Sequence, residues 1–136
     1  MKYPQSEEYV FYKGQKFQVE FYYDKNGDMP VKEYFEGASY DVQKKLLALV
    51  IRIAEYGKLF DEEKYRIVDK NNKIFEFKPL NERFFNFFCE DRRIILTNAY
   101  QKQKQKVDPR ELKKAVNLMK DYKQRVSEGK YYEKQK

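Results

Sequence analysis

Residues 65–99 read YRIVDKNNKIFEFKPLNERFFNFFCEDRRIILTNA, and this stretch decides the fold. Its apolar and aromatic residues fall into short runs, each bounded by residues that favour turns. Connections this short can join only antiparallel neighbours, so the stretch predicts an antiparallel meander. The third run carries phenylalanine on both faces, which is typical of a central strand covered on both sides. The predicted strands are Tyr65–Asp69, Lys73–Phe77, Arg83–Cys89 and Arg93–Ala99.

Upstream of this meander, the sequence predicts one strand and two helices. Apolar and polar residues alternate from Phe17 to Tyr23, as in a strand with one buried face. Asp28 is expected to cap a short helix that Gly37 ends. A longer helix is expected over Tyr40–Tyr56, where apolar residues recur every three or four positions before a glycine that suits a left-handed cap.

Downstream of the meander, Asp108 and the following proline predict the start of a last helix, which Gly129 ends. The expected order is β-α-α-β-β-β-β-α, an α+β fold with an antiparallel sheet in a single domain. We expect an N-terminal extension over residues 1–14, the folded domain over 15–128, and a frayed basic tail over 129–136.

The positive charge of the chain is concentrated at its C-terminal end. The formal net charge is +7 over 136 residues. From Arg92 onward the chain carries 14 Lys and Arg against 5 Asp and Glu, whereas the preceding residues carry 15 against 17. Such asymmetry favours a polyanionic partner, with RNA as the leading candidate. The simpler interpretation is a solvated basic helix and tail.

The composition excludes several kinds of site and favours a cytoplasmic protein. Histidine is absent and Cys89 is the one cysteine, so a zinc site with the usual ligands, a Ser-His or Cys-His pair and an internal disulfide cannot be built. No glycine-rich phosphate loop occurs, and the carboxylates show no metal-ligand spacing. We therefore expect no metal and no cofactor. No apolar run is long enough for a membrane span or a signal peptide, so no membrane partner is expected.

Cleavage of RNA is one reaction that the remaining side chains can support. The 2′-hydroxyl of the substrate is the nucleophile, so the protein must orient the backbone, stabilise charge on phosphorus and move protons. Arginine and lysine suit phosphate oxygens. A lysine becomes a general base near neutral pH only if burial or neighbouring cations lower its pKa. A tyrosine can stack on a base or assist proton transfer.

Several segments together resemble the RelE/ParE superfamily, specifically its phage-derived HigB-like branch. In that branch, a strand of the form E-L-R/K-P leads to an arginine-bearing strand, a further strand ending in an aromatic residue, a lysine-rich loop and a helix that opens with proline. The likeness covers about Phe17 to Tyr122. The matching segments are IFEFKP at 74–79, Arg83, RRIILTNAY at 92–100, QKQKQKVDP at 101–109, MPVKEYF at 29–35 and AEYG at 54–57.

This resemblance implies a RelE-like fold and a metal-independent mRNA interferase, an endoribonuclease that cuts mRNA in the ribosomal A site. It also implies a cognate antitoxin, often of the helix-turn-helix type, as a partner beside mRNA and the ribosome. By position, the resemblance implies catalytic roles, in phosphate binding and transition-state stabilisation, for Lys78, Arg83 and Lys102, and in stacking or proton transfer for Tyr100. The implied RNA-binding residues are Arg92, Arg93, Lys104, Gln105 and Lys106.

The sequence departs from the family pattern in its loop, where glutamine and lysine alternate over 101–106, and in an extra residue before Pro109. The histidine of some relatives is absent, so the general acid and base stay unassigned. Lys78 also admits a structural interpretation as an exposed ion pair with Glu76, and Arg83 as a residue at the water boundary. A ParE-like gyrase inhibitor of the same fold and a non-catalytic RNA- or ribosome-binding module remain alternatives.

Overall fold

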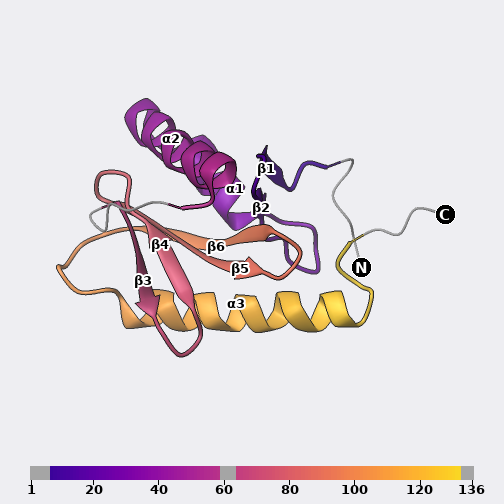
Figure 1. Cartoon of the computed structure of the whole chain (residues 1–136). Coiled ribbons are helices and arrows are strands. Elements are labelled where there is room, and N and C mark those ends of the chain that lie inside the picture. Colours follow the sequence, from indigo (N-terminus) through magenta and orange to yellow (C-terminus); the bar gives the residue numbers. More distant parts are fainter. Residues whose placement is uncertain (1–6, 59–63, 133–136) are drawn as a thin grey trace.

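The computed structural model describes residues 7–58 and 64–132. Its elements form one mixed sheet with helices on both faces, as Figure 1 shows. The order along the sheet is β1-β2-β6-β5-β4-β3. The strands are β1 (Val10–Lys13), β2 (Gln18–Phe21), β3 (Tyr65–Asp69), β4 (Ile74–Phe77), β5 (Glu82–Cys89) and β6 (Arg93–Gln101), and the helices are α1 (Pro30–Gly37), α2 (Tyr40–Tyr56) and α3 (Pro109–Ser127).

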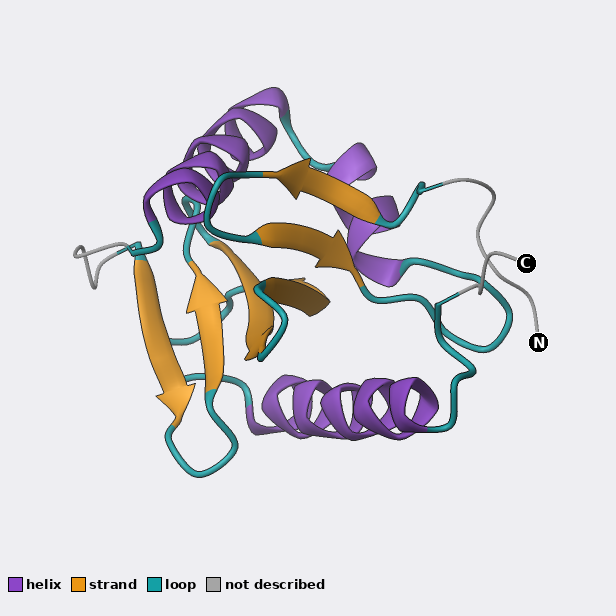
Figure 2. Cartoon of the chain, turned by 45° about the vertical axis from the view of Figure 1, so that its right-hand side comes forward, coloured by secondary structure: helices purple, strands orange, loops and turns teal. Residues whose placement is uncertain are grey.

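The predicted meander is confirmed: β3, β4, β5 and β6 pair with their neighbours in antiparallel fashion. The central strand β5 is buried on both faces, with Phe84, Phe85 and Phe87 at most 1% exposed. The α+β class is also confirmed. In Figure 2, α3 lies along one face of the sheet, whereas α1 and α2 lie on the other.

The expectation of a wholly antiparallel sheet was wrong. Strand β2 pairs with β6 in parallel, with Gln18 beside Arg93 and Phe21 beside Leu96. Short connections make the strands of the meander antiparallel. Two helices and three strands separate β2 from β6 in the chain, and so long a connection allows either a parallel or an antiparallel pairing. The residues before Phe17 also contribute a strand, because β1 pairs with β2 in antiparallel fashion. The predicted domain boundaries stay predictions.

The ends of the three helices are stabilised in different ways. At α3, the Asp108 carboxylate accepts hydrogen bonds from the backbone N–H groups of Arg110 and Glu111, as predicted. At α2, Gly57 ends the helix with φ 85°, also as predicted. The prediction that Asp28 caps α1 was wrong. Helix α1 begins after Met29 without a side-chain cap, and Pro30, whose φ already suits a helix, occupies its first turn.

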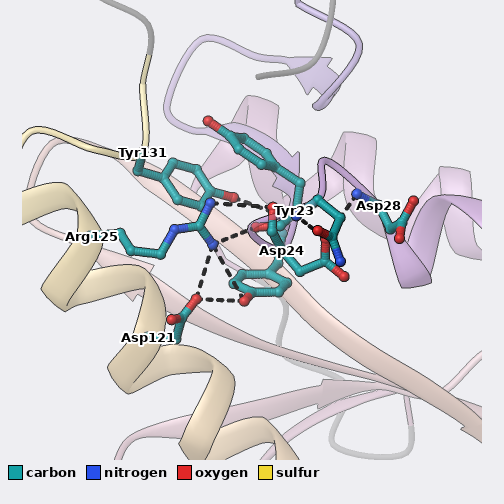
Figure 3. Close-up of polar contacts among 8 residues, drawn as sticks. Tyr23, Asp24, Asp28, Asp121, Arg125 and Tyr131 are labelled. Carbon is teal, nitrogen blue, oxygen red and sulfur yellow. Dashed lines mark hydrogen bonds and ion pairs between the residues drawn. The ribbon is translucent and has the colours of Figure 1, made fainter. Parts of the chain in front are cut away.

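Tyr131 and Tyr132, in the described part of the chain after α3, are packed, which corrects the expectation of a frayed tail for these residues; residues 133–136 of the expected tail lie outside the described residues. Tyr131 is 0% exposed, stacks on Tyr23 at 4.1 Å between ring centroids, and accepts a hydrogen bond from the Tyr23 N–H. The Arg125 guanidinium lies 4.7 Å from the Tyr131 ring and donates to the Tyr23 carbonyl and to Asp121 (Figure 3). Through these contacts, the segment after α3 packs against the loop after β2. Tyr132 adds a hydrogen bond to the buried Glu20.

This architecture places several chain segments at one end of the sheet. The turn between β4 and β5, the end of β6 and the start of α3 all meet there, because β5 begins where β4 and β6 end. The backbone N–H of Lys102 donates to the Asn81 carbonyl at 2.7 Å, which joins the end of β6 to the β4–β5 turn. The predicted catalytic residues all lie at this end.

Candidate active site

Three of the predicted catalytic side chains form a row across neighbouring strands. Arg83 of β5 pairs with Tyr100 of β6, and Phe77, the residue before Lys78, pairs with Phe84 of β5. Alternate residues of a strand share a face, so Lys78 lies on the same face as Glu76, and Tyr100 on the same face as Asn98. That face is the one covered by α3, since the Asn98 amide donates to Glu111.

Arg83 is a buried residue that holds the turn beside it. Arg83 is only 7% exposed. Its Nη1 donates hydrogen bonds to the backbone carbonyls of Leu80 and Glu82, both at 2.8 Å. Leu80 has a left-handed backbone with φ 57°, which is costly for a leucine. The Arg83 guanidinium therefore stabilises a strained turn at the site, and the idea that Arg83 marks the water boundary is wrong.

The electrostatic surroundings of Lys78 disfavour its charged form. Burial lowers the pKa of the Lys78 ammonium, and the positive charges of Arg66, Arg83 and Lys102 lower it further, whereas Glu76 opposes them. The charged residues that act on this lysine come from β3 (Arg66), β4 (Glu76), β5 (Arg83) and the position directly after β6 (Lys102). The pKa of Lys78 is thus shifted in the direction that a lysine acting as a general base requires.

Glu76 and Arg66 belong to the cluster, although the sequence did not single them out as site residues. Glu76 is 0% exposed, and its Oε2 accepts a hydrogen bond from Nε of Arg66 at 2.6 Å. The interpretation of Glu76 and Lys78 as an exposed ion pair was therefore wrong about the exposure of Glu76, whose carboxylate also binds Arg66. No local sequence signal marks this contact, because it depends on the register of β3 against β4, which sets Arg66 opposite Glu76.

Tyr100 lies between the sheet and the start of α3. Its ring packs against Phe85 with 5.6 Å between centroids, and its hydroxyl accepts a hydrogen bond from the Asp108 N–H at 3.3 Å. Burial raises the pKa of the Tyr100 hydroxyl, and the carboxylates of Glu76 and Asp108 raise it further. The hydroxyl therefore stays protonated at neutral pH and is available as a donor.

The lysine-rich loop encloses a pocket beside Tyr100. The pocket has a volume of about 520 Å³, and its walls include the Tyr100 ring, Val107 and Pro109. Lys104 and Lys106 line the pocket. Gln105, between them in the sequence, is solvent-exposed and is not among the lining residues. Two of the three predicted RNA-binding residues in the loop thus face a hollow that is continuous with the row through Tyr100.

Arg92 and Arg93 lie away from this site. They stand in the turn between β5 and β6, at the opposite end of these strands from Arg83 and Tyr100. The Arg93 guanidinium forms ion pairs with the buried Glu20 and with the exposed Asp91, both at 2.7 Å, and it lies over the Tyr132 ring. Their predicted contact with RNA stays a prediction, but it would involve a surface separate from the candidate active site.

Neither a metal cluster nor a membrane span adds to this site within residues 7–58 and 64–132. No group of three or more Cys, Asp or Glu side chains in this part of the chain is arranged to hold a metal ion. None of the described helices combines the length and the apolar character that crossing a membrane requires.

A family model described as phage derived protein Gp49-like (DUF891) matches residues 33–120 of this chain. The matched region runs from α1 into α3 and includes all four predicted catalytic residues. No curated protein matches the chain.

Proposed function

The chain belongs to the Gp49-like family of phage-derived proteins, and on that basis we propose that it is the toxin of a toxin–antitoxin pair. The family lies within the RelE/HigB-like toxin superfamily, which also supports an antitoxin as the protein partner. The activity that best fits the candidate active site is metal-independent cleavage of mRNA. The observation that carries this proposal is the convergence of Lys78, Arg83 and Lys102 beside Tyr100.

The proposed reaction transfers the phosphoryl group within the RNA strand. The 2′-oxygen attacks the adjacent phosphorus, the bond from phosphorus to the 5′-oxygen breaks, and the products are a 2′,3′-cyclic phosphate and a 5′-hydroxyl. Lys78 in its neutral form accepts the proton of the 2′-hydroxyl. The Tyr100 hydroxyl donates to the leaving 5′-oxygen, and the ammonium of Lys102 stabilises the charge that builds on the phosphate.

Arg83 supports this chemistry mainly by holding the turn that carries Lys78. Its guanidinium is occupied by two backbone carbonyls and is largely buried. Lys104 and Lys106 are proposed to bind the phosphates that flank the scissile one, because they line the pocket beside Tyr100. A nucleobase next to the cut can enter that pocket, whose walls are partly aromatic and apolar.

The test is induced expression in a bacterial host, with growth curves and primer extension across abundant mRNAs. We expect growth arrest and discrete cuts within translated regions for the wild-type chain. A Lys78→Ala/Lys102→Ala variant should grow normally and leave mRNA intact. A Lys44→Ala/Lys45→Ala variant removes the same charge from exposed positions on α2 and should behave as wild type. Arrest with intact mRNA would point instead to a gyrase inhibitor, and normal growth of the wild-type strain to an inactive or purely binding protein.

A further inference from the structure

Glu76 is a buried carboxylate whose second oxygen has no assigned role. Oε2 is bound by Arg66, but Oε1 is buried and has no hydrogen-bond partner among the described residues. An unpaired buried carboxylate oxygen costs folding free energy, and such atoms in a folded protein call for an explanation. On the neighbouring strand, the Nε of Arg83 is likewise buried without a partner in the described part of the chain.

The position of Glu76 suggests what the second oxygen serves. Glu76 lies between Arg66 of β3 and Phe85 of β5, two residues before Lys78 on the same face of β4. The charged groups that act on Lys78 are Arg66 from β3, Glu76 from β4, Arg83 from β5 and Lys102 after β6. Among these influences Glu76 supplies the negative charge. Loss of Glu76 would therefore remove a negative charge that opposes the repulsion among these cations.

We infer that Glu76 is a positioning residue for the proposed cleavage reaction: its buried carboxylate binds the Arg66 guanidinium and holds that side chain, together with its own negative charge, on the face of the sheet that carries Lys78. This inference rests on the proposed function and extends it. Glu76 does not touch RNA, because it is 0% exposed. It acts through the Arg66 guanidinium that its Oε2 binds and through its negative charge near Lys78.

This role predicts an unusual split between binding and cleavage. Glu76→Gln removes a negative charge beside a site for a polyanion, so RNA affinity should rise or stay the same. Cleavage should nevertheless slow by roughly 10- to 100-fold, because Arg66 loses its ion-pair partner and misplacement of a charged group by about 1 Å can cost that much. The acid limb of the pH–rate profile should also move to lower pH, since Glu76 is the group that keeps the pKa of Lys78 from falling further.

The experiment measures binding and cleavage separately on the full chain. Affinity is measured with an RNA that carries a 2′-deoxy nucleotide at the cleavage position, and cleavage is measured in single turnover from pH 5 to 9 with the matched all-ribose RNA. Glu82→Gln is the matched control, because Glu82 lies on β5 but bonds to Tyr34 of α1, on the opposite face of the sheet. The control should change neither the affinity nor the pH profile.

Two further measurements keep the outcome decisive. Arg66→Gln removes a cation and should shift the acid limb to higher pH, opposite to Glu76→Gln. Because it also leaves the buried Glu76 without this ion pair, circular dichroism first checks that the variant is folded. Titration of Lys78 by NMR of methylated lysines, without RNA, should show the same opposite shifts whether or not the wild type cleaves RNA. A wild type without cleavage would remove the proposed function, whereas unchanged Lys78 titration or unchanged cleavage in Glu76→Gln would overturn the role of Glu76.

Discussion

At the scale of single residues, the proposed chemistry depends on how the surroundings of Lys78 lower the pKa of its ammonium group. An exposed lysine at its reference pKa of ~10.4 is almost fully protonated at neutral pH and cannot accept a proton. Burial and the neighbouring cations of Arg66, Arg83 and Lys102 shift the balance toward the neutral form. Because the sequence has no histidine, a lysine with a lowered pKa is one of the few groups that can serve this protein as a general base.

The substitution Lys78→Arg separates phosphate binding from proton transfer. The arginine keeps the positive charge but cannot lose its proton in this pH range. We expect near wild-type affinity for a 2′-deoxy RNA and a single-turnover cleavage rate roughly 10²- to 10⁴-fold lower, the usual contribution of a general base. The wild-type rate should rise with pH through the pKa of Lys78. Equal rates for wild type and Lys78→Arg would contradict a proton-transfer role.

Arg83 should behave as a structural residue more than as a phosphate ligand. Its loss leaves the carbonyls of Leu80 and Glu82 without their donor at a turn with a strained leucine. We expect Arg83→Ala to lower the free energy of unfolding by about 2–4 kcal/mol, the cost of unsatisfied polar groups at a buried position. Urea denaturation measures this cost. A fully stable Arg83→Ala protein that has lost only RNA binding would favour direct phosphate contact instead.

At the scale of elements, the sequence predicted the meander, α2 and α3 well because their signals are local. Turn residues delimit the strands, the Asp108-Pro109 pair starts α3 and Gly57 ends α2. The parallel pairing of β2 with β6 was missed because it joins segments far apart in the chain, and nothing within either segment specifies direction. The short β1 was missed for a similar reason, since its pairing partner and not its own composition makes it a strand.

The candidate site was predictable in part for the same physical reason. Lys78, Arg83 and Tyr100 come together because neighbouring antiparallel strands bring their ends to one edge, which the meander already implied. The contribution of Arg66 and Glu76 depends on the register between β3 and β4, which the sequence did not specify. The burial of Arg83 depends on the backbone of a tight turn, and this too lies beyond a sequence pattern.

The two aspartates expected to cap helices provide a paired test at this scale. Asp108 accepts two backbone hydrogen bonds at the start of α3, so Asp108→Ala should cost about 1 kcal/mol of stability. Asp28 is exposed and does not cap α1, so Asp28→Ala should change stability by less than about 0.5 kcal/mol. Thermal denaturation of both variants in one buffer compares them directly. Equal losses would mean that the start of α3 is not capped as described.

At the scale of the whole molecule, the C-terminal residues complete the fold around α3. Tyr131 fills a buried position between Tyr23 and Arg125, and Tyr132 reaches Glu20 on β2. The expectation of a frayed tail was wrong for Tyr131 and Tyr132, because the basic and polar composition of the tail did not reveal that these two aromatic rings pack against the fold. The active-site end and the tyrosine-rich end thus lie at opposite ends of the β5–β6 hairpin.

Tyr131 variants measure how much this closure contributes. Tyr131→Ala removes a fully buried ring and should lower the free energy of unfolding by about 3–5 kcal/mol, as for other large aromatic side chains. Tyr131→Phe keeps the ring but loses the bond from the Tyr23 N–H, and should cost about 1–3 kcal/mol. Urea denaturation ranks the three proteins. A Tyr131→Ala protein as stable as wild type would show that the tail does not pack there in solution.

The most direct test of the central claim is the chemistry of the RNA ends after induced expression. Ends at each cut can be typed by ligation and by phosphatase and kinase treatments, in wild type and in Lys78→Arg. Attack by the 2′-hydroxyl predicts 2′,3′-cyclic phosphate and 5′-hydroxyl ends that are absent from the variant. Cuts with 5′-phosphate and 3′-hydroxyl ends, or cuts that persist in Lys78→Arg, would contradict a metal-independent ribonuclease centred on Lys78.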